Sequence, residues 1–286
     1  MLDTLKELLL DIERLDPFPA TATRVLEVIT QPRLDPQEQI DTLMPLVIAD
    51  AGITTRVLRA ANSAERGSET PIDSVHRACI ELGSDRTAAL ALASVVACRF
   101  MGLGGSTLRS NHSLWTESLA TATACRLIGE RCDYEDVELA FTAGLLQNMA
   151  FIAMDRFLQR QRAEIRARIE LGHGWLAAER EVLGATHTYI GARIATKWQL
   201  PAVLVDVIQN HHAPARSSGD PILCKIAAIG EALTWAALGD AEHPAITHRT
   251  NVSMADDLGL SHAELADLLR CLPAELATTR QWLNVE

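Results

Sequence analysis

The chain is 286 residues long with a mass of 31.2 kDa, a length that allows one large domain or two ordinary ones. Hydrophobic residues make up 48% of it, enough for a buried core, and 42 Ala and 39 Leu against 14 Val and 18 Ile favour a mostly helical fold. The formal net charge is −11 and no stretch concentrates basic residues, so the pattern argues against nucleic-acid binding while leaving room for a pocket that takes a small nucleotide.

The first hundred residues predict a series of short helices. Leu and Ile recur at intervals of three and four between Leu2 and Ile12, and the prolines that follow stop this helix because proline lacks a backbone N–H. Asp35 is the predicted cap of a helix that begins at Pro36. Further helices are predicted at 21–30, 51–62, 73–82 and 85–100.

A glycine-dense segment at 102–106 is the predicted domain boundary. Beyond it, long helices are predicted at 114–130 and 135–159. The part of the second helix from Val137 to Met154 is apolar on nearly every face, which is typical of a helix at the centre of a domain.

Shorter helices complete the C-terminal half, and no segment alternates as a strand would. Ser261 and Glu264 form a predicted capping box for the last of them. These helices are expected at 161–171, 175–183, 187–197, 202–211, 221–238 and 262–271. The expected fold is therefore all-α, with two helical subdomains at 1–105 and 106–286.

The cysteine pattern and the lack of a long apolar segment predict the cellular compartment of the protein. The six cysteines form no CxxC pair and mostly occupy apolar helical positions, as free thiols do in a reducing compartment. The longest strongly apolar run, Ala88–Cys98, has 11 residues and is too short to span a bilayer. The N-terminal segment carries acidic residues and lacks a cleavage site, so no signal peptide is expected. We therefore expect a soluble, cytoplasmic protein that does not act at a membrane.

Three groups of polar residues interrupt the apolar pattern. Gln147 and Asn148 are adjacent in the predicted central helix, where each buried side chain needs a hydrogen-bond partner or costs about 1–3 kcal/mol. His211 and His212 end an apolar helix, and His187 lies near the start of another. Two interpretations are open, namely satisfied polar groups of the core or the remains of a site. The other histidines, at 76, 112, 173, 243, 248 and 262, are expected to be structural or solvated.

Short motifs follow one another in a fixed order along most of the chain. They lie at 15–19, 50–58, 61–64, 72–75, 82–83, 115–120, 144–146, 186–187, 191, 198, 200–201, 208 and 211–212. In this order and spacing they resemble the HDOD branch of the HD superfamily of metal-dependent phosphohydrolases. The resemblance implies an HD-like fold for the C-terminal subdomain.

The resemblance also implies what the site would need for catalysis. Catalytic HD enzymes bind one or two metal ions through His and Asp and activate water on a phosphoester. By this register the superfamily's His-Asp pair falls on Gln147 and Asn148, whose neutral amides are poor ligands for a transition metal. We therefore expect Gln147, Asn148, His187 and His212 to form a hydrogen-bonded polar cluster in place of a metal.

The other positions of the degenerate pocket follow from the same register. The superfamily's first His falls on Glu117 and its closing Asp near Glu231, while His187, His211 and His212 keep the imidazoles. With the defining pair lost, the expectation is that the protein is not an enzyme and has no catalytic residue, no metal and no other cofactor.

Asn62 and Ser63 belong to the most recognisable family segment and lie in the N-terminal subdomain. They are candidate functional residues, but they also suit the end of the fourth helix. Asn tolerates the left-handed conformation, and both side chains can bond local backbone groups. The structural interpretation is favoured.

HDOD members commonly lack the catalytic set and act as regulatory or scaffolding modules in bacterial signalling. The resemblance thus predicts a non-catalytic signal-transduction protein that acts through protein partners or small-ligand sensing. Its expected partners are a histidine kinase, a response regulator or a cyclic-dinucleotide enzyme. The first alternative is a residual metal-dependent phosphohydrolase of a nucleotide or cyclic dinucleotide. The second is a nucleotide receptor using Arg193, Lys197 and Trp198, although the favoured interpretation of these residues is a solvated face with Trp198 packed inward.

Overall fold

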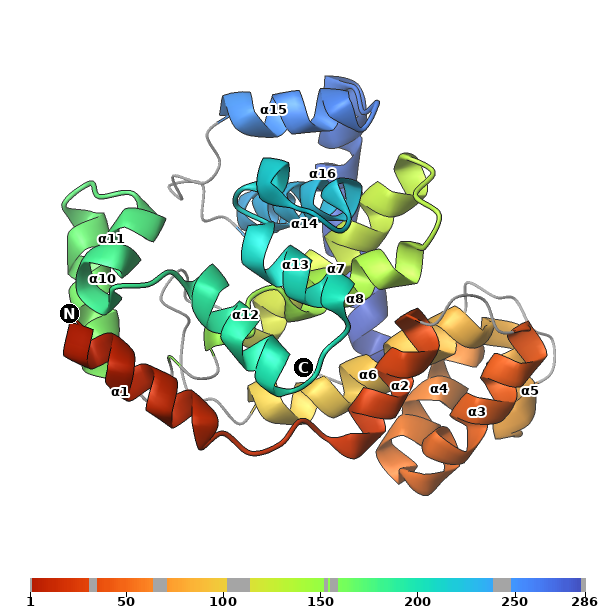
Figure 1. Cartoon of the computed structure of the whole chain (residues 1–286). Coiled ribbons are helices and arrows are strands. Elements are labelled where there is room, and N and C mark those ends of the chain that lie inside the picture. Colours follow the sequence, from red (N-terminus) through yellow and green to blue (C-terminus); the bar gives the residue numbers. More distant parts are fainter. Residues whose placement is uncertain are drawn as a thin grey trace. The chain divides into compact units, whose positions relative to one another are not determined.

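The computed structural model describes residues 2–30, 35–63, 71–101, 114–151, 154, 159–238 and 248–283. Over these residues the chain is all-α: helices are joined by turns and no strand is formed (Figure 1). The all-helical prediction is confirmed. None of the described helices is long and apolar enough to cross a membrane.

The chain divides into two compact units, each built from two separate stretches of sequence. The larger unit combines Met1–Pro17 with Arg99–Pro273, and the smaller unit combines Phe18–Cys98 with Ala274–Glu286. No single cut in the sequence separates the two units. The first 17 residues belong with the C-terminal part of the chain, and residues 274–286 belong with the N-terminal part. The boundary predicted near residue 105 lies outside the described residues, and the ranges 1–105 and 106–286 stay a prediction.

Local capping sets where helices of the smaller unit begin. Asp35 Oδ1 accepts a hydrogen bond from the backbone N–H of Gln37 at 2.9 Å, and Asp50 Oδ1 accepts from that of Gly52 at 2.8 Å. Both caps satisfy N–H groups that the first turn of a helix leaves free. The unit contains α2 (Ala20–Thr30), α3 (Pro36–Ala49), α4 (Ala51–Ala61), α5 (Val75–Leu82), most of α6 (Ser84–Met101) and the end of α16 (His262–Leu283).

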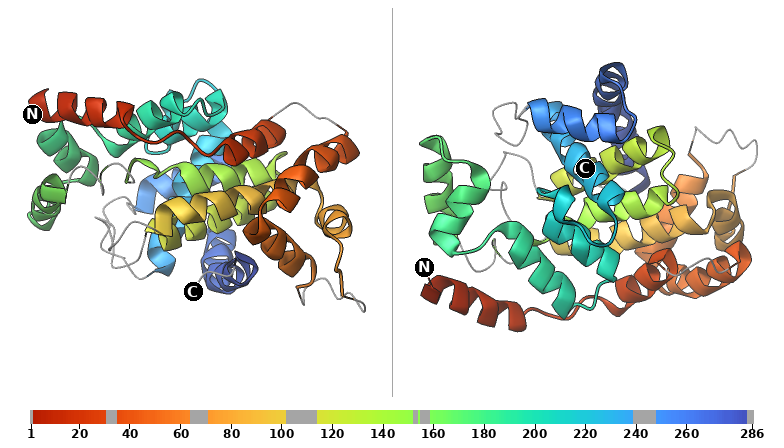
Figure 2. Two further views of the ribbon diagram at one scale, coloured as in Figure 1. Left: turned by 90° about the horizontal axis from the view of Figure 1, so that it is seen from below. Right: turned by 45° about the horizontal axis from the view of Figure 1, so that its top comes forward.

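Three helices pack against one another at the centre of the larger unit: α7 (Leu114–Arg131), α8 (Val137–Leu146) and α14 (Pro221–Ala237), as the views in Figure 1 and Figure 2 show. Their close approach requires glycine at two positions. A Cβ at Gly144 would lie 2.7 Å from Cys125 Sγ, and a Cβ at Gly230 would lie 2.5 Å from the same atom. Residues 139–146 of α8 are all buried, which confirms the prediction of a central apolar helix there.

The remaining helices of the larger unit include the N-terminal one. Lys197 Nζ donates to the carbonyl of Ile12 at 2.7 Å, and the Trp198 indole N–H donates to that of Asp16 at 3.0 Å. These two side chains therefore hold the N-terminal segment, and Trp198 is packed inward rather than facing a nucleotide. The helices are α1 (Leu2–Glu13), α10 (Gln159–Glu170), α11 (Trp175–Leu183), α12 (His187–Lys197), α13 (Ala202–Asn210), η2 (Pro214–Arg216), α15 (His248–Asp257) and the start of α16.

Three helix predictions differ from the structure. The helix expected at 135–159 ends at Leu146. Beyond it the main-chain hydrogen bonds span three residues instead of the four of an α-helix: the Met149 N–H donates to the carbonyl of Leu146, and the Phe151 N–H donates to that of Asn148. Helix α15 was not expected, because its sequence is polar and lacks a clear apolar stripe. Helix α16 continues through Pro273 to residue 283, because its last turns carry buried side chains that pack in the smaller unit.

Candidate functional site

The predicted pocket residues lie in the larger unit at the ends of its helices. Gln147 and Asn148 lie in the turn after α8 rather than inside a helix, which corrects the prediction. His187 is the first residue of α12, and His211 and His212 follow α13. Asn148, His187, His211 and His212 thus all lie at or just beyond the end of a helix. Glu117 and Glu231 lie on α7 and α14.

A buried carboxylate holds His187. Thr186 caps α12, and Glu179 of α11 accepts hydrogen bonds from both the backbone N–H and the Nδ1 of His187, each at 2.8 Å to Oε2. The other oxygen of Glu179 accepts from the Trp175 indole N–H at 2.6 Å. Glu179 and His187 are both fully buried. Since a carboxylate only accepts, Nδ1 carries the proton and Nε2 faces the other histidines.

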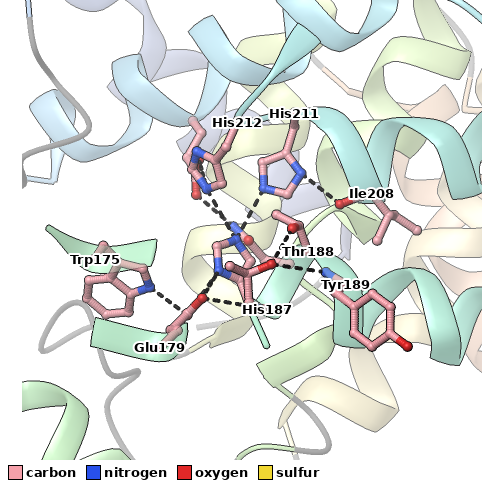
Figure 3. Close-up of polar contacts among 11 residues, drawn as sticks. Trp175, Glu179, His187, Thr188, Tyr189, Ile208, His211 and His212 are labelled. Carbon is pink, nitrogen blue, oxygen red and sulfur yellow. Dashed lines mark hydrogen bonds and ion pairs between the residues drawn. The ribbon is translucent and has the colours of Figure 1, made fainter. Parts of the chain in front are cut away.

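The three imidazoles meet through their Nε2 atoms (Figure 3). His187 Nε2 lies 3.2 Å from His212 Nε2 and 3.4 Å from His211 Nε2. His211 Nδ1 faces two backbone carbonyls, at 3.0 Å and 3.2 Å, so it too carries a proton. Two neutral rings in this tautomer point lone pairs at each other, an arrangement that a proton or a cation between them would stabilise.

The donor set suits the metal that the superfamily implies. Metal–nitrogen bonds of about 2.0–2.1 Å at a tetrahedral centre place neighbouring nitrogens about 3.3–3.4 Å apart. The distances from His187 to the other two histidines, 3.2 Å and 3.4 Å, are close to this value, and the ligand atoms of all three lie within 4.8 Å of one another. Metal-bound histidines commonly donate their other N–H to a carboxylate or a carbonyl, as His187 and His211 do here. His187, His211 and His212 would therefore hold one divalent transition metal, and the expectation of no metal stays a prediction.

Asn148 and Gln147 differ in their contacts. Asn148 Nδ2 donates to Glu231 Oε1 at 3.0 Å, and Glu231 Oε2 lies 3.5 Å from His212 Nε2. Asn148 is thus linked through Glu231 to His212 and from there to His187. Gln147 is fully buried, and neither its Oε1 nor its Nε2 has a hydrogen-bond partner among the described residues. The structure brings three members of the expected polar cluster together and leaves Gln147 out.

Glu117 is buried on α7 of the same unit, but the three-histidine group found among the described residues includes neither Glu117 nor Glu231. Of the three histidines, His187 and His211 are fully buried, whereas the side chain of His212 is 15% exposed. Any ligand that reaches the group from solvent therefore meets His212.

Asn62 has a structural role in the smaller unit. It ends α4, as the favoured interpretation predicted, with φ −95° and not in the left-handed conformation that Asn tolerates. Its Nδ2 donates to the carbonyls of Leu58 at 2.8 Å and Ile72 at 2.7 Å, and its Oδ1 accepts from the Ile72 N–H at 2.7 Å. The side chain thus joins the end of α4 to a segment ten residues further on. Ser63 Oγ has no partner among the described residues.

Sequence analysis did not single out Glu179 or Trp175. The available signal was weak: an acidic residue on the apolar face of a short helix, four residues after a tryptophan and eight before a histidine. An acidic residue in the buried stripe of a helix needs a partner, and that partner here comes from the next helix.

Comparison with known proteins identifies the family. The sequence profile of the HDOD domain matches residues 15–214, most of the chain, and the chain belongs to this family. An uncharacterised protein of Treponema pallidum is 26% identical over 208 residues, which cover 70% of this chain and 38% of that protein. The chain thus spans little more than a third of the length of that relative.

Solved structures share the fold. An HDOD domain protein of unknown function from Geobacter sulfurreducens superposes with a TM-score of 0.77 at 20% identity and covers 99% of both chains. A provisionally assigned signal-transduction protein from Marinobacter aquaeolei has a TM-score of 0.75 at 19% identity, over 98% of this chain and 65% of that one. A provisionally assigned phosphohydrolase from Shewanella amazonensis has a TM-score of 0.67 at 21% identity, over 96% and 97%. At these identities the likeness concerns the fold.

Proposed function

We propose that this HDOD protein is a regulatory component of bacterial signal transduction that acts in the cytoplasm without turnover, by binding a protein partner or a small ligand. The observation that carries the proposal is the replacement of the HD superfamily's metal-binding pair by Gln147 and Asn148. A carboxylate would supply a negative charge to the site, whereas both of these side chains are neutral.

The contacts of Asn148 support the same conclusion. Its amide nitrogen faces Glu231, so the amide acts as a donor and occupies one carboxylate oxygen that could otherwise bind a cation. Gln147 makes no side-chain hydrogen bond among the described residues and offers one neutral oxygen. Asn148 therefore supports Glu231 in the folded pocket, and neither amide adds the negative charge that a metal ion for phosphoester chemistry would need.

A partner screen tests the proposal. The purified full chain, immobilised, should retain a histidine kinase, a response regulator or a cyclic-dinucleotide enzyme from the same cell, with the retained protein confirmed by pairwise binding of purified components. A parallel phosphodiesterase assay with added Mn²⁺ should give no turnover. Turnover that His187→Ala abolishes would contradict the proposal, and so would the lack of any confirmed partner together with the lack of any small ligand.

The second candidate is a residual metal-dependent phosphohydrolase of a nucleotide or cyclic dinucleotide. The observation that favours it is the convergence of three Nε2 atoms within 4.8 Å of one another. A divalent ion held there would lower the pKa of a bound water. Glu179 would keep the Nε2 of His187 turned towards the ion, and Glu231 could accept a proton beside His212.

A gain-of-function variant separates the two candidates. Gln147→His combined with Asn148→Asp restores the superfamily pair and should raise phosphodiesterase activity from an undetectable level if the first proposal is right. If the wild type already hydrolyses the substrate and the double variant adds less than about tenfold, the second candidate is favoured.

A further inference from the structure

A cavity of about 410 Å³ opens beside the histidine group in the larger unit. It lies between α11, α12, α13 and η2, and His212 forms part of its wall. The volume falls within the range of about 300–1,000 Å³ that is usual for small-molecule sites. The walls also include Leu176, Arg180, Thr186, Thr188, Tyr189, Asp206, Gln209, Asn210, Ala213, Arg216 and Ser218.

Two arginines give this cavity its chemistry. Arg180 comes from α11 and Arg216 from η2, and neither guanidinium has an ion pair or a hydrogen bond within the part of the chain that the structure describes. Two arginines of the same unit that do not line the cavity are paired: Arg131 with Asp267 at 3.0 Å, and Arg168 with Glu181 at 2.6 Å. Two uncommitted guanidinium groups on one cavity suit a phosphate or carboxylate, which arginine binds through two parallel N–H groups.

The acidic residue of the wall does not cancel this charge by pairing with an arginine. Asp206 accepts from Ser217 Oγ at 2.5 Å, Asn210 Nδ2 at 2.9 Å, Gly219 N–H at 3.3 Å and Ser218 N–H at 3.4 Å. Its oxygens are thus occupied by the loop that follows Arg216. This anchoring fixes the loop to α13 and keeps Arg216 at the cavity.

Tyr189 adds a flat apolar surface. It lies on the first turn of α12, lines the cavity and is 42% exposed, a large fraction for an aromatic side chain in a chain with only 4% aromatics. Neighbouring Thr186 and Thr188 share a hydrogen bond between their hydroxyl groups at 2.7 Å. An exposed ring beside cationic groups is the arrangement that binds a planar ring carrying an anionic substituent.

We infer that this cavity binds a small anionic molecule that contains a planar ring, with Arg180 and Arg216 on its phosphate or carboxylate and Tyr189 against its ring. The inference rests on the small-ligand form of the proposed function and names the chemical class of the ligand. His212 connects the cavity to His187 and Glu231, so an occupied cavity contacts the buried polar network directly.

Calorimetric titration of the full chain with defined probes tests the inference. Adenosine monophosphate carries both ring and phosphate, whereas ribose 5-phosphate lacks the ring and adenosine lacks the phosphate; benzoate supplies the carboxylate form. The monophosphate or benzoate should bind, and the monophosphate should bind more tightly than either of its fragments. Binding of neither at about 1 mM, a concentration that would half-fill even a weak site, would overturn the inference.

Variants assign the contacts. Arg180→Gln and Arg216→Gln should each weaken the bound anionic probe about tenfold or more, because each removes a charged hydrogen-bond donor. Arg77→Gln is the control, since Arg77 is an exposed arginine of α5 that does not line the cavity, and it should leave the affinity unchanged. Tyr189→Ala should lower the affinity at least about fivefold for a probe with a ring, and Tyr189→Phe should restore it. Unchanged affinity in both cavity arginine variants would refute the assignment.

The same titration distinguishes a failure of this inference from a failure of the proposed function. If the monophosphate binds and is recovered intact, both stand. If it binds and is hydrolysed, the cavity is confirmed as the ligand site and the absence of turnover is refuted. If nothing binds while a protein partner does, the cavity assignment fails and the regulatory function stands on the partner alone.

Discussion

The carboxylate of Glu179 is the most informative group to perturb, because three N–H groups depend on it. It accepts from the backbone N–H and the Nδ1–H of His187 and from the indole N–H of Trp175, all in a fully buried setting. In Glu179→Gln one of the two oxygens becomes an NH₂ donor. At least one of the three N–H groups then faces a donor and loses its partner.

The magnitude follows from these contacts. One buried donor left without an acceptor costs about 1–3 kcal/mol, and each of two remaining bonds loses about 1 kcal/mol when its acceptor is no longer charged. We therefore expect Glu179→Gln to lower the free energy of unfolding by about 3–5 kcal/mol, a large part of the 5–15 kcal/mol typical of a folded protein. Urea denaturation followed by circular dichroism at neutral pH measures it.

A matched control lies two residues away on the same helix. Glu181 pairs with Arg168 and His173, but its side chain is 42% exposed, so solvent screens these pairs. Glu181→Gln should cost less than about 1 kcal/mol. If Glu179→Gln and Glu181→Gln differ by less than about 1 kcal/mol, the conclusion that Glu179 anchors His187 is wrong.

Three further predictions concern other parts of the molecule. Asn62→Ala should lower the stability of the smaller unit by about 2–4 kcal/mol in urea denaturation, because three hydrogen bonds are lost; a loss under about 0.5 kcal/mol would contradict this. Gly230→Ala should destabilise the protein, and Cys125→Ala should restore part of the lost stability. Cys125→Ala should not restore the stability of Gly144→Ala, because the new Cβ there also meets backbone atoms at 2.8–2.9 Å. Equal restoration in both variants would contradict this packing around Cys125. Although burial opposes ionisation of Asp206, its hydrogen bonds outweigh that effect and lower its pKa, so the stability advantage of the wild type over Asp206→Asn should be full at neutral pH and shrink as the pH falls below about 4. An advantage that grew on acidification would contradict the last prediction.

Helix starts were the most predictable part of the fold. The cap at Asp35 and the capping box of Ser261 with Glu264 were both predicted, because each joins residues within three positions of each other along the chain. Helix ends were less predictable. The turn at Gln147 interrupts an apolar sequence, and α16 passes through Pro273, because in both places distant packing outweighs local preference.

The sequence predicted most residues of the candidate site but not which of them contact one another. The resemblance named His187, His211, His212 and Glu231, which the structure places in one buried network. It did not name Glu179, and it could not tell that Asn148 would bond Glu231 while Gln147 made no side-chain hydrogen bond among the described residues. These contacts join residues up to 83 positions apart along the chain.

Composition and short-range patterns therefore determined that this protein is helical and where most of its helices begin, and the resemblance of motifs along the chain predicted the family. Only the tertiary structure decided which nitrogen of each histidine faces its neighbours. The short connection from α11 to α12 brings Glu179 to His187, and the end of α13 brings His211 and His212 to the same point. Helix starts depend on interactions within one turn, whereas the site depends on the ends of helices that are remote in sequence and meet through burial of their apolar faces.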